Sequence, residues 1–127
     1  MAQNILIVDD SPSIRRMIAG ALVAAGFKVT VCESAQQALA AASGSSLDAV
    51  VTDLNMPEMD GLELTRRLRM SAGAASCPIL ILTTENSAAR KQEAKLAGAS
   101  GWVLKPFQEE TLVRAIRTVC EKAGSKS

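Results

Sequence analysis

The chain has 127 residues, of which 48% are hydrophobic and 21% charged, and its net charge is +1. These values fit one globular domain over residues 1–127 and exclude a disordered chain. The sequence has no basic block for nucleic acid and no apolar run of the ~20 residues that a membrane helix needs. It contains no His, and Cys32, Cys77 and Cys120 are widely spaced. We therefore predict reduced thiols in a cytoplasmic monomer without a signal peptide.

Strand and helix signals alternate along the first half of the chain. Ser11 followed by Pro12 is typical of a helix start, and Gly26 is placed to end that helix. Ser34 with Gln37 forms the pattern of a capping box at the start of an alanine-rich helix. The elements predicted in this half are strands 4–8, 28–32 and 48–52 and helices 12–25 and 35–44.

The second half continues the alternation after a loop of turn-forming residues at 53–61. In the next helix, predicted over residues 62–72, the arginines, Arg69 among them, are expected to face solvent. Helix 87–97 has few large apolar side chains, with Leu96 as its main expected anchor, so we predict that it shifts most easily. The remaining predicted elements are strands 78–82 and 101–104 and helix 109–122.

Polar residues directly follow four of the predicted strands. The near-continuous apolar strands predict a parallel α/β sheet with helices on both faces. The carboxyl ends of parallel strands meet at one edge, so one crevice should hold Asp9, Asp10, Asp53, Thr83 and Lys105. A like-charge pair ~4 Å apart costs roughly 4 kcal/mol at an effective dielectric near 20. The three carboxylates therefore predict a divalent metal ion.

A simpler interpretation exists for several of these residues. Taken alone, Asp9 and Asp10 could merely cap the helix that follows them. Asp53 and Lys105 likewise come directly after predicted strands, and this shared placement favours a functional site instead. Trp102 is open to two interpretations, as a plain core or surface aromatic or as a functional one.

Four motifs together resemble the receiver domain of two-component response regulators. They are Ile7-Val8-Asp9-Asp10, the run from Asp53 to Gly61, Leu82-Thr83-Thr84 and Lys105-Pro106-Phe107. The match covers essentially the whole chain, and Gly98-Ala99-Ser100-Gly101 adds a likeness to stand-alone chemotaxis regulators of the CheY type. The resemblance implies a flavodoxin-like (βα)5 fold, a doubly wound parallel five-stranded sheet with the order 2-1-3-4-5 that is known for CheY.

The resemblance also implies a role for each residue of the crevice. Asp53 would accept a phosphoryl group as an acyl phosphate, so the protein is a phosphoacceptor that assists its own phosphorylation and dephosphorylation, not an enzyme. Mg²⁺ would bind Asp9, Asp10, the Asp53 carboxylate and the backbone carbonyl of Asn55. Lys105 would neutralise phosphoryl oxygens, and a cis peptide bond before Pro106 would aim its ammonium group.

Further residues of the family pattern would read out or tune the phosphate. The Thr83 hydroxyl would turn to the phosphoryl group and make room for a rotation of Trp102. The fourth helix, fifth strand and fifth helix would then present an altered face. Asn55 and Glu85 would set the rate of hydrolysis, and Thr84, larger than the residue usual in the family, would narrow access to Asp53.

The leading hypothesis is a two-component signalling protein without an output domain. A chemotaxis-type histidine kinase would phosphorylate it, and its partners would include a flagellar switch protein and a phosphatase. The alternative within this class is a phosphate sink or relay intermediate. A Mg²⁺-dependent aspartyl-phosphate phosphohydrolase is less favoured, because its nucleophile would follow the first strand. A flavodoxin-like nucleotide binder is less favoured too, because Asp9 and Asp10 would repel phosphate.

Overall fold

The computed structural model describes residues 3–44, 46–71 and 74–124. Five parallel strands form one sheet in the order β2-β1-β3-β4-β5, which confirms the predicted flavodoxin-like fold. The strands are β1 (Asn4–Val8), β2 (Lys28–Cys32), β3 (Ala49–Asp53), β4 (Ile79–Thr83) and β5 (Gly101–Leu104). The helices found in the described residues are α1 (Pro12–Ala24), α2 (Ala35–Gly44), α3 (Gly61–Arg69), α4 (Ala88–Ala97) and α5 (Glu109–Gly124).

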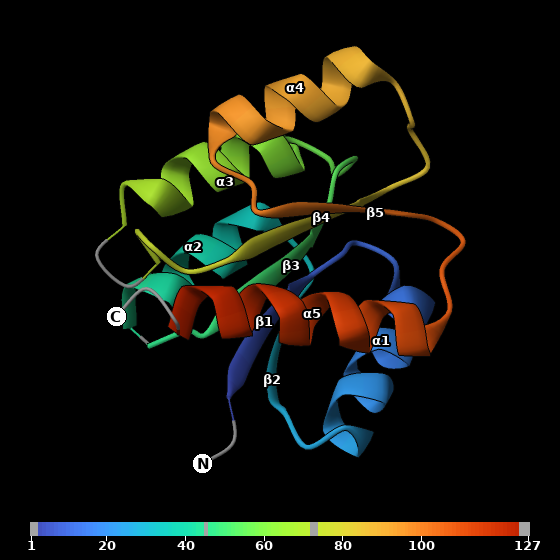
Figure 1. Ribbon diagram of the computed structural model, residues 1–127. Helices are drawn as coiled ribbons and strands as arrows, with labels where there is room; N and C mark the ends of the chain where they lie inside the picture. The colour runs from blue at the N-terminus through green and yellow to red at the C-terminus, as the bar shows by residue number, and fades with distance from the viewer. Residues whose placement is uncertain (1–2, 45, 72–73, 125–127) are drawn as a thin grey trace.

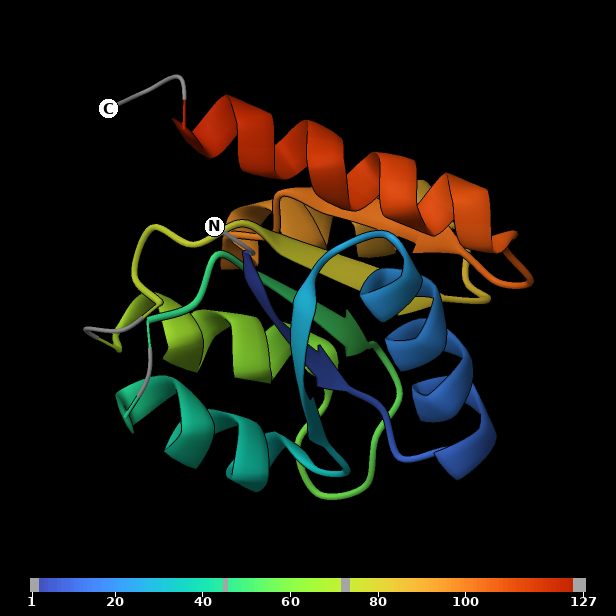
Figure 2. The same cartoon turned by 90° about the horizontal axis from the view of Figure 1, so that it is seen from below.

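The helices cover both faces of the sheet (Figures 1 and 2). Helices α1 and α5 lie on one face, and α2, α3 and α4 lie on the other. Alternate residues of one strand contribute to the two hydrophobic cores, since Ile5 and Ile7 pack with α1 and α5 while Leu6 and Val8 pack with the opposite helices. A strand that is buried on both faces needs apolar residues throughout, which explains the near-continuous runs in the sequence. The residues that the structure describes include no helix with both the length and the hydrophobicity of a membrane span.

Two helix starts predicted from the sequence, after Ser11 and after Ser34, are confirmed. The Ser11 hydroxyl accepts a hydrogen bond from the Ile14 amide at 3.4 Å, as expected of an N-cap residue. The Ser34 hydroxyl accepts from the Gln37 amide at 3.2 Å, and the Gln37 side chain accepts from the Glu33 amide at 3.0 Å. The bonds to the two serine hydroxyls satisfy amide groups that the first turn of a helix leaves free.

Some boundaries differ from the prediction. Strands β3 and β4 each lie one residue later than expected, so Asp53 and Thr83 are the last residues of their strands. Helix α3 starts at Gly61 instead of Leu62, because the Asp60 side chain caps it by accepting from the Glu63 amide at 2.9 Å. The helix ends at Arg69, earlier than predicted, while Ala72, its predicted end, lies outside the described residues.

Two predictions about side chains of α3 and α4 are wrong. Leu96 is 78% exposed and does not anchor α4, which instead buries the small side chains of Ala94 and Ala97. Arg69 does not face solvent, because its guanidinium donates to the carbonyl oxygens of Gly98 at 2.7 Å and of Cys77 at 2.6 Å. Helical spacing places Arg69 beside the apolar stripe, and the free carbonyl at the end of α4 supplies its partner.

Candidate functional site

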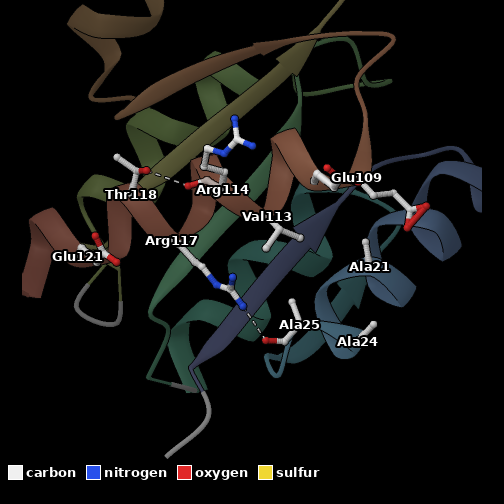
Figure 3. Close-up of a pocket in the computed structure, with 10 residues that line it drawn as sticks. Ala21, Ala24, Ala25, Glu109, Val113, Arg114, Arg117, Thr118 and Glu121 are labelled. Carbon is white, nitrogen blue, oxygen red and sulfur yellow. Dashed lines mark hydrogen bonds between the residues drawn. The ribbon is translucent and has the colours of Figure 1, made fainter.

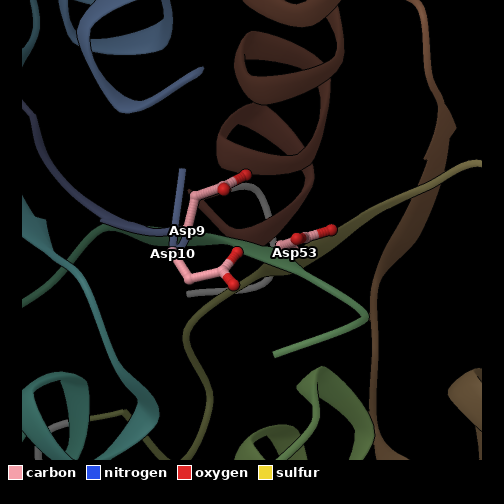
Figure 4. A group of neighbouring side chains, drawn as sticks. All are labelled: Asp9, Asp10 and Asp53. Atoms are coloured by element: carbon pink, nitrogen blue, oxygen red, sulfur yellow. The ribbon is translucent and has the colours of Figure 1, made fainter. Parts of the chain in front are cut away.

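Three aspartates meet at the carboxyl edge of the sheet (Figure 4). Asp9 and Asp10 directly follow β1, Asp53 ends β3, and these two strands are paired neighbours. One carboxylate oxygen from each of the three residues lies within 4.8 Å of the others. The structure therefore brings the predicted acidic residues together.

The three carboxylates differ in their exposure to solvent. Asp9 is fully buried, and its carboxylate accepts from the Ser11 amide at 2.9 Å. The guanidinium of Arg15 donates to the Asp9 backbone carbonyl at 2.7 Å, which fixes this end of β1. Asp53 is 7% exposed, whereas Asp10 is exposed. The cluster is thus held rigidly at Asp9 and opens to solvent through Asp10.

Lys105 neutralises part of this charge. Its ammonium nitrogen lies 3.0 Å from the Asp53 carboxylate and 3.4 Å from that of Asp9. The residue directly follows β5, and its backbone amide donates to the Thr83 carbonyl at 2.8 Å. The peptide bond between Lys105 and Pro106 is cis. The predicted position of the ammonium group, opposite the carboxylates, is observed.

The surroundings of Asp53 disfavour its charged form. Burial raises the pKa of the Asp53 carboxyl, the hydrogen bond from Lys105 lowers it, and the neighbouring charge of Asp9 raises it again. The pKa is raised overall, so burial and like charge outweigh the ammonium group. A carboxylate held in this way gains stability from an added cation or from protonation.

The chemistry of the donor set fits Mg²⁺. Magnesium is bound by a few carboxylate or carbonyl oxygens and keeps several waters, and the exposed Asp10 leaves room for them. Among the residues that the structure describes, the cluster combines three carboxylates with one ammonium group, so its net charge is negative. Asn55 lies in the exposed loop two residues after Asp53, and the role of its carbonyl stays a prediction.

Thr83 lies beside the acidic cluster at the end of β4. Asp53 is in register with Leu82, so Thr83 is one residue beyond the partner of Asp53 at the same edge. Thr83 is 1% exposed, and its hydroxyl oxygen accepts from the Glu85 amide at 3.0 Å. The hydroxyl proton is not used in that bond and can be donated elsewhere. The intervening Thr84 is exposed.

Trp102 and Glu85 are joined across the loop that follows β4. The indole nitrogen of Trp102 donates to the Glu85 carbonyl at 3.2 Å, and the ring packs against the core on the α4 side. The Glu85 carboxylate accepts from Arg90 of α4 at 3.1 Å. Sequence reasoning missed Arg90, because the path of the loop decides which of several charged residues reaches Glu85.

A separate groove of about 590 Å³ lies between α1 and α5 (Figure 3). Its floor includes the small side chains of Ala21 and Ala24, and Val113 projects into it from α5. Arg117 crosses the groove and donates to the Ala25 carbonyl at the end of α1, at 3.1 Å. This groove does not include the acidic cluster, so it is not the reactive site.

Comparison with known proteins identifies the family. A family model described as the response regulator receiver domain matches residues 5–117. The chain is 35% identical over 116 residues to protein PilH of Pseudomonas aeruginosa, covering 91% of this chain and 96% of PilH. It is also 35% identical over 124 residues to the phosphate regulon transcriptional regulatory protein PhoB of the same organism, covering 98% of this chain. The chain belongs to the response regulator receiver domain family.

The relatives differ in length. The chain spans 54% of PhoB, about half of that protein, but almost all of PilH. Receiver domains take a phosphoryl group from histidine kinases and are phosphoacceptors rather than ordinary enzymes. They bind Mg²⁺ at an acidic pocket, and the cluster of three aspartates is such a pocket.

Solved structures support the same assignment. The chemotaxis protein CheY4 of Vibrio cholerae superposes with a TM-score of 0.91 at 42% identity, covering 94% of this chain and 99% of that one. The receiver domain of a sensor histidine kinase from Pseudomonas aeruginosa superposes with a TM-score of 0.87 at 28% identity, with 95% and 99% coverage. That structure is described with a magnesium ion coordinated in its active-site cleft.

Proposed function

We propose that this chain is a single receiver domain that accepts one phosphoryl group on Asp53 from a histidine kinase, in a reaction that needs Mg²⁺. The observation that carries the proposal is the geometry around Asp53. Its carboxylate is nearly buried, lies 3.0 Å from the Lys105 ammonium and shares a crevice with two further carboxylates. A carboxylate with a raised pKa and two acidic neighbours is typical of a functional group rather than of a simple helix cap.

The proposed reaction is a direct transfer of the phosphoryl group. A carboxylate oxygen of Asp53 attacks the phosphorus of a phosphohistidine, the phosphorus–nitrogen bond breaks, and its electron pair returns to the imidazole. Lys105 then pairs with phosphoryl oxygens instead of the Asp53 carboxylate. Asp9, Asp10, Asp53 and the Asn55 carbonyl would hold Mg²⁺, which supplies charge neutralisation to the transferred group.

The Thr83 hydroxyl is the proposed sensor of the phosphate. Thr83 is buried beside Asp53 and its hydroxyl proton can be donated to a phosphoryl oxygen. Thr83 and Trp102 both form hydrogen bonds with the backbone of Glu85. A movement of Thr83 would therefore shift Glu85 and change the hydrogen bond of the indole ring. Asn55, Glu85 and Thr84 follow the ends of β3 and β4 and would set the rates of phosphorylation and hydrolysis.

The face formed by α4, β5 and α5 is the proposed output surface. Leu96 of α4 and Leu104 of β5 are large apolar side chains with 78% and 38% exposure. The 42% identity to the chemotaxis protein CheY4 supports an output in chemotaxis. A flagellar switch protein as partner and a chemotaxis-type kinase as donor are part of the proposal. The alternative output is a phosphate sink or relay in the cytoplasm.

A pull-down with an acyl-phosphate mimic tests this output. The protein is immobilised with Mg²⁺, with or without beryllium fluoride, and exposed to purified flagellar switch protein or, in a parallel sample, to a purified histidine phosphotransfer protein. Binding only in the presence of beryllium fluoride would support the motor output. Binding of a histidine phosphotransfer protein instead would support the relay, and binding of the switch protein by Asp53→Asn under the same conditions would contradict the assigned acceptor.

A further inference from the structure

Glu85 connects three parts of the molecule through three different groups. Its amide donates to the Thr83 hydroxyl at 3.0 Å, its carbonyl accepts from the Trp102 indole at 3.2 Å, and its carboxylate accepts from Arg90 at 3.1 Å. The first two partners belong to β4 and β5, and the third belongs to α4. The ion pair with Arg90 therefore ties α4 to the loop that holds Thr83 and Trp102.

Arg90 is itself well fixed in the first turn of α4. Its amide donates to the hydroxyl of the N-cap residue Ser87 at 3.0 Å. A second nitrogen of its guanidinium lies 3.3 Å from the Glu93 carboxylate. The guanidinium thus spans two carboxylates, one on the loop and one on the next turn of the helix. A side chain held from both sides loses little further freedom when it binds Glu85.

The two ends of α4 are attached with different strength. At its C-terminal end, the partly buried guanidinium of Arg69 donates to the Gly98 carbonyl from two nitrogens, at 2.7 and 3.1 Å. At its N-terminal end, the pair of Glu85 and Arg90 is open to solvent, with side-chain exposures of 40% and 28%. Exposed ion pairs are weak. Because only alanines anchor α4 in the core, its N-terminal end is the part that can be released most easily.

We propose that Arg90 is a positioning residue, which holds Glu85, and through it Thr83 and Trp102, in the phosphate-free arrangement. The inference rests on the proposed function, since it concerns the movement of Thr83 toward a phosphoryl group. When Thr83 turns, it gives up the Glu85 amide, and Glu85 keeps its hydrogen bonds to Trp102 and Arg90. Rupture of the ion pair then frees the start of α4, while Arg69 keeps its end in place.

The expected effect has a definite sign. Arg90→Ala removes a contact made only in the inactive arrangement, so the active arrangement becomes more populated and a ligand that selects it binds more tightly. For an exposed ion pair, the gain in affinity is about two- to fivefold. Alanine is the best helix former, so the substitution does not threaten α4.

A purely electrostatic effect would have the opposite sign. Without Arg90, the freed Glu85 carboxylate would repel an anionic ligand and weaken its binding. At about 0.15 M ionic strength the screening length is only about 8 Å, and the half-exposed carboxylate can turn into solvent. We therefore expect release of the loop to outweigh this repulsion.

The experiment measures the affinity for beryllium fluoride with Mg²⁺ at about 0.15 M ionic strength. Trp102 is the only tryptophan, and its fluorescence is used to follow binding. Arg90→Ala should bind two- to fivefold more tightly than the wild type, with the same emission at saturation, and Arg90→Lys should lie between them. In a Glu85→Gln background, Arg90→Ala should have no further effect. The matched control is Arg67→Ala, which removes an arginine–glutamate pair of 3.0 Å within α3 and should leave the affinity unchanged.

The outcomes separate this inference from the proposed function. Unchanged or weaker binding by Arg90→Ala would overturn the inference, as would an equal gain in the Glu85→Gln background. If the wild type does not bind beryllium fluoride, or if Asp53→Asn binds it equally well, the proposed function fails instead. Circular dichroism of each variant shows whether α4 is retained, and Arg90→Gln replaces any variant that does not fold.

Discussion

Replacing Asp53 with asparagine should stabilise the metal-free protein. The substitution keeps the size of the side chain and its ability to accept a hydrogen bond from Lys105, but it removes one negative charge from the cluster. Burial and the charge of Asp9 raise the pKa of Asp53, so its ionised form costs free energy in the folded state. The acceptor residue is thus expected to lower the stability of the protein that carries it.

The charges of the cluster give the magnitude of this effect. At an effective dielectric near 20, each of two like charges placed at the outer limit of 4.8 Å repels Asp53 by about 3.5 kcal/mol, and Lys105 at 3.0 Å attracts it by about 5.5 kcal/mol. The repulsions exceed the attraction by about 1.5 kcal/mol. We expect Asp53→Asn to raise the free energy of unfolding by about 1–2 kcal/mol at neutral pH.

The dependence on pH tests the cause. Because the folded state raises the pKa of Asp53, its protonated form stabilises the fold fully below the ordinary carboxyl pKa of about 3.9. This contribution is lost as the pH rises through the raised value. The increase in the free energy of unfolding caused by Asp53→Asn should therefore be small near pH 4 and should grow toward neutral pH.

Urea unfolding followed by circular dichroism, with a chelator present, measures this difference. Asp60→Asn is the matched control, since asparagine caps a helix as well as aspartate does and Asp60 caps α3. A destabilised Asp53→Asn protein, or an advantage that does not vary with pH, would refute the electrostatic reasoning.

Three further predictions follow from the geometry. Gly61→Ala should destabilise by about 2–3 kcal/mol in urea unfolding, because a Cβ atom there would lie 2.5 Å from the Asp53 carbonyl oxygen; unchanged stability would contradict this contact. Burial raises the pKa of the Cys77 thiol to about 12, so alkylation at pH 8 should be slow until the protein unfolds, and fast labelling of the native protein would be inconsistent with it. Mg²⁺ at ten times its dissociation constant should stabilise the wild type by about 1.4 kcal/mol, and a chelator should reverse this shift in melting temperature; an equal gain for Asp10→Asn would argue against the site.

The positions of the reactive residues could be predicted from the sequence because they depend on strand ends. In a parallel sheet, the residue after each buried strand lies at the same edge, so Asp9, Asp53 and Lys105 were expected together and are found together. A shift of one residue in the bounds of β3 and β4 does not change this result. The strand order itself came from the family resemblance and not from the apolar pattern.

The contacts of α3 and α4 could not be predicted in the same way. Helical periodicity shows which face of a helix is apolar, but it does not show which neighbour meets the edge of that face. Arg69 turns to the carbonyl of Gly98, and Leu96 is left in solvent, because two alanines let α4 lie close to its neighbours. The pairing of Glu85 with Arg90 depends likewise on the path of a loop.

The most direct test of the proposed function is the incorporation of phosphate into the purified protein. Incubation with Mg²⁺ and a small amido phosphate, followed by mass spectrometry of the intact chain, should show a single added phosphoryl group. The group should be absent without Mg²⁺ and absent from Asp53→Asn, whereas the control Asp60→Asn should be labelled like the wild type. Labelling of Asp53→Asn at the wild-type level would contradict the assignment of Asp53 as the acceptor.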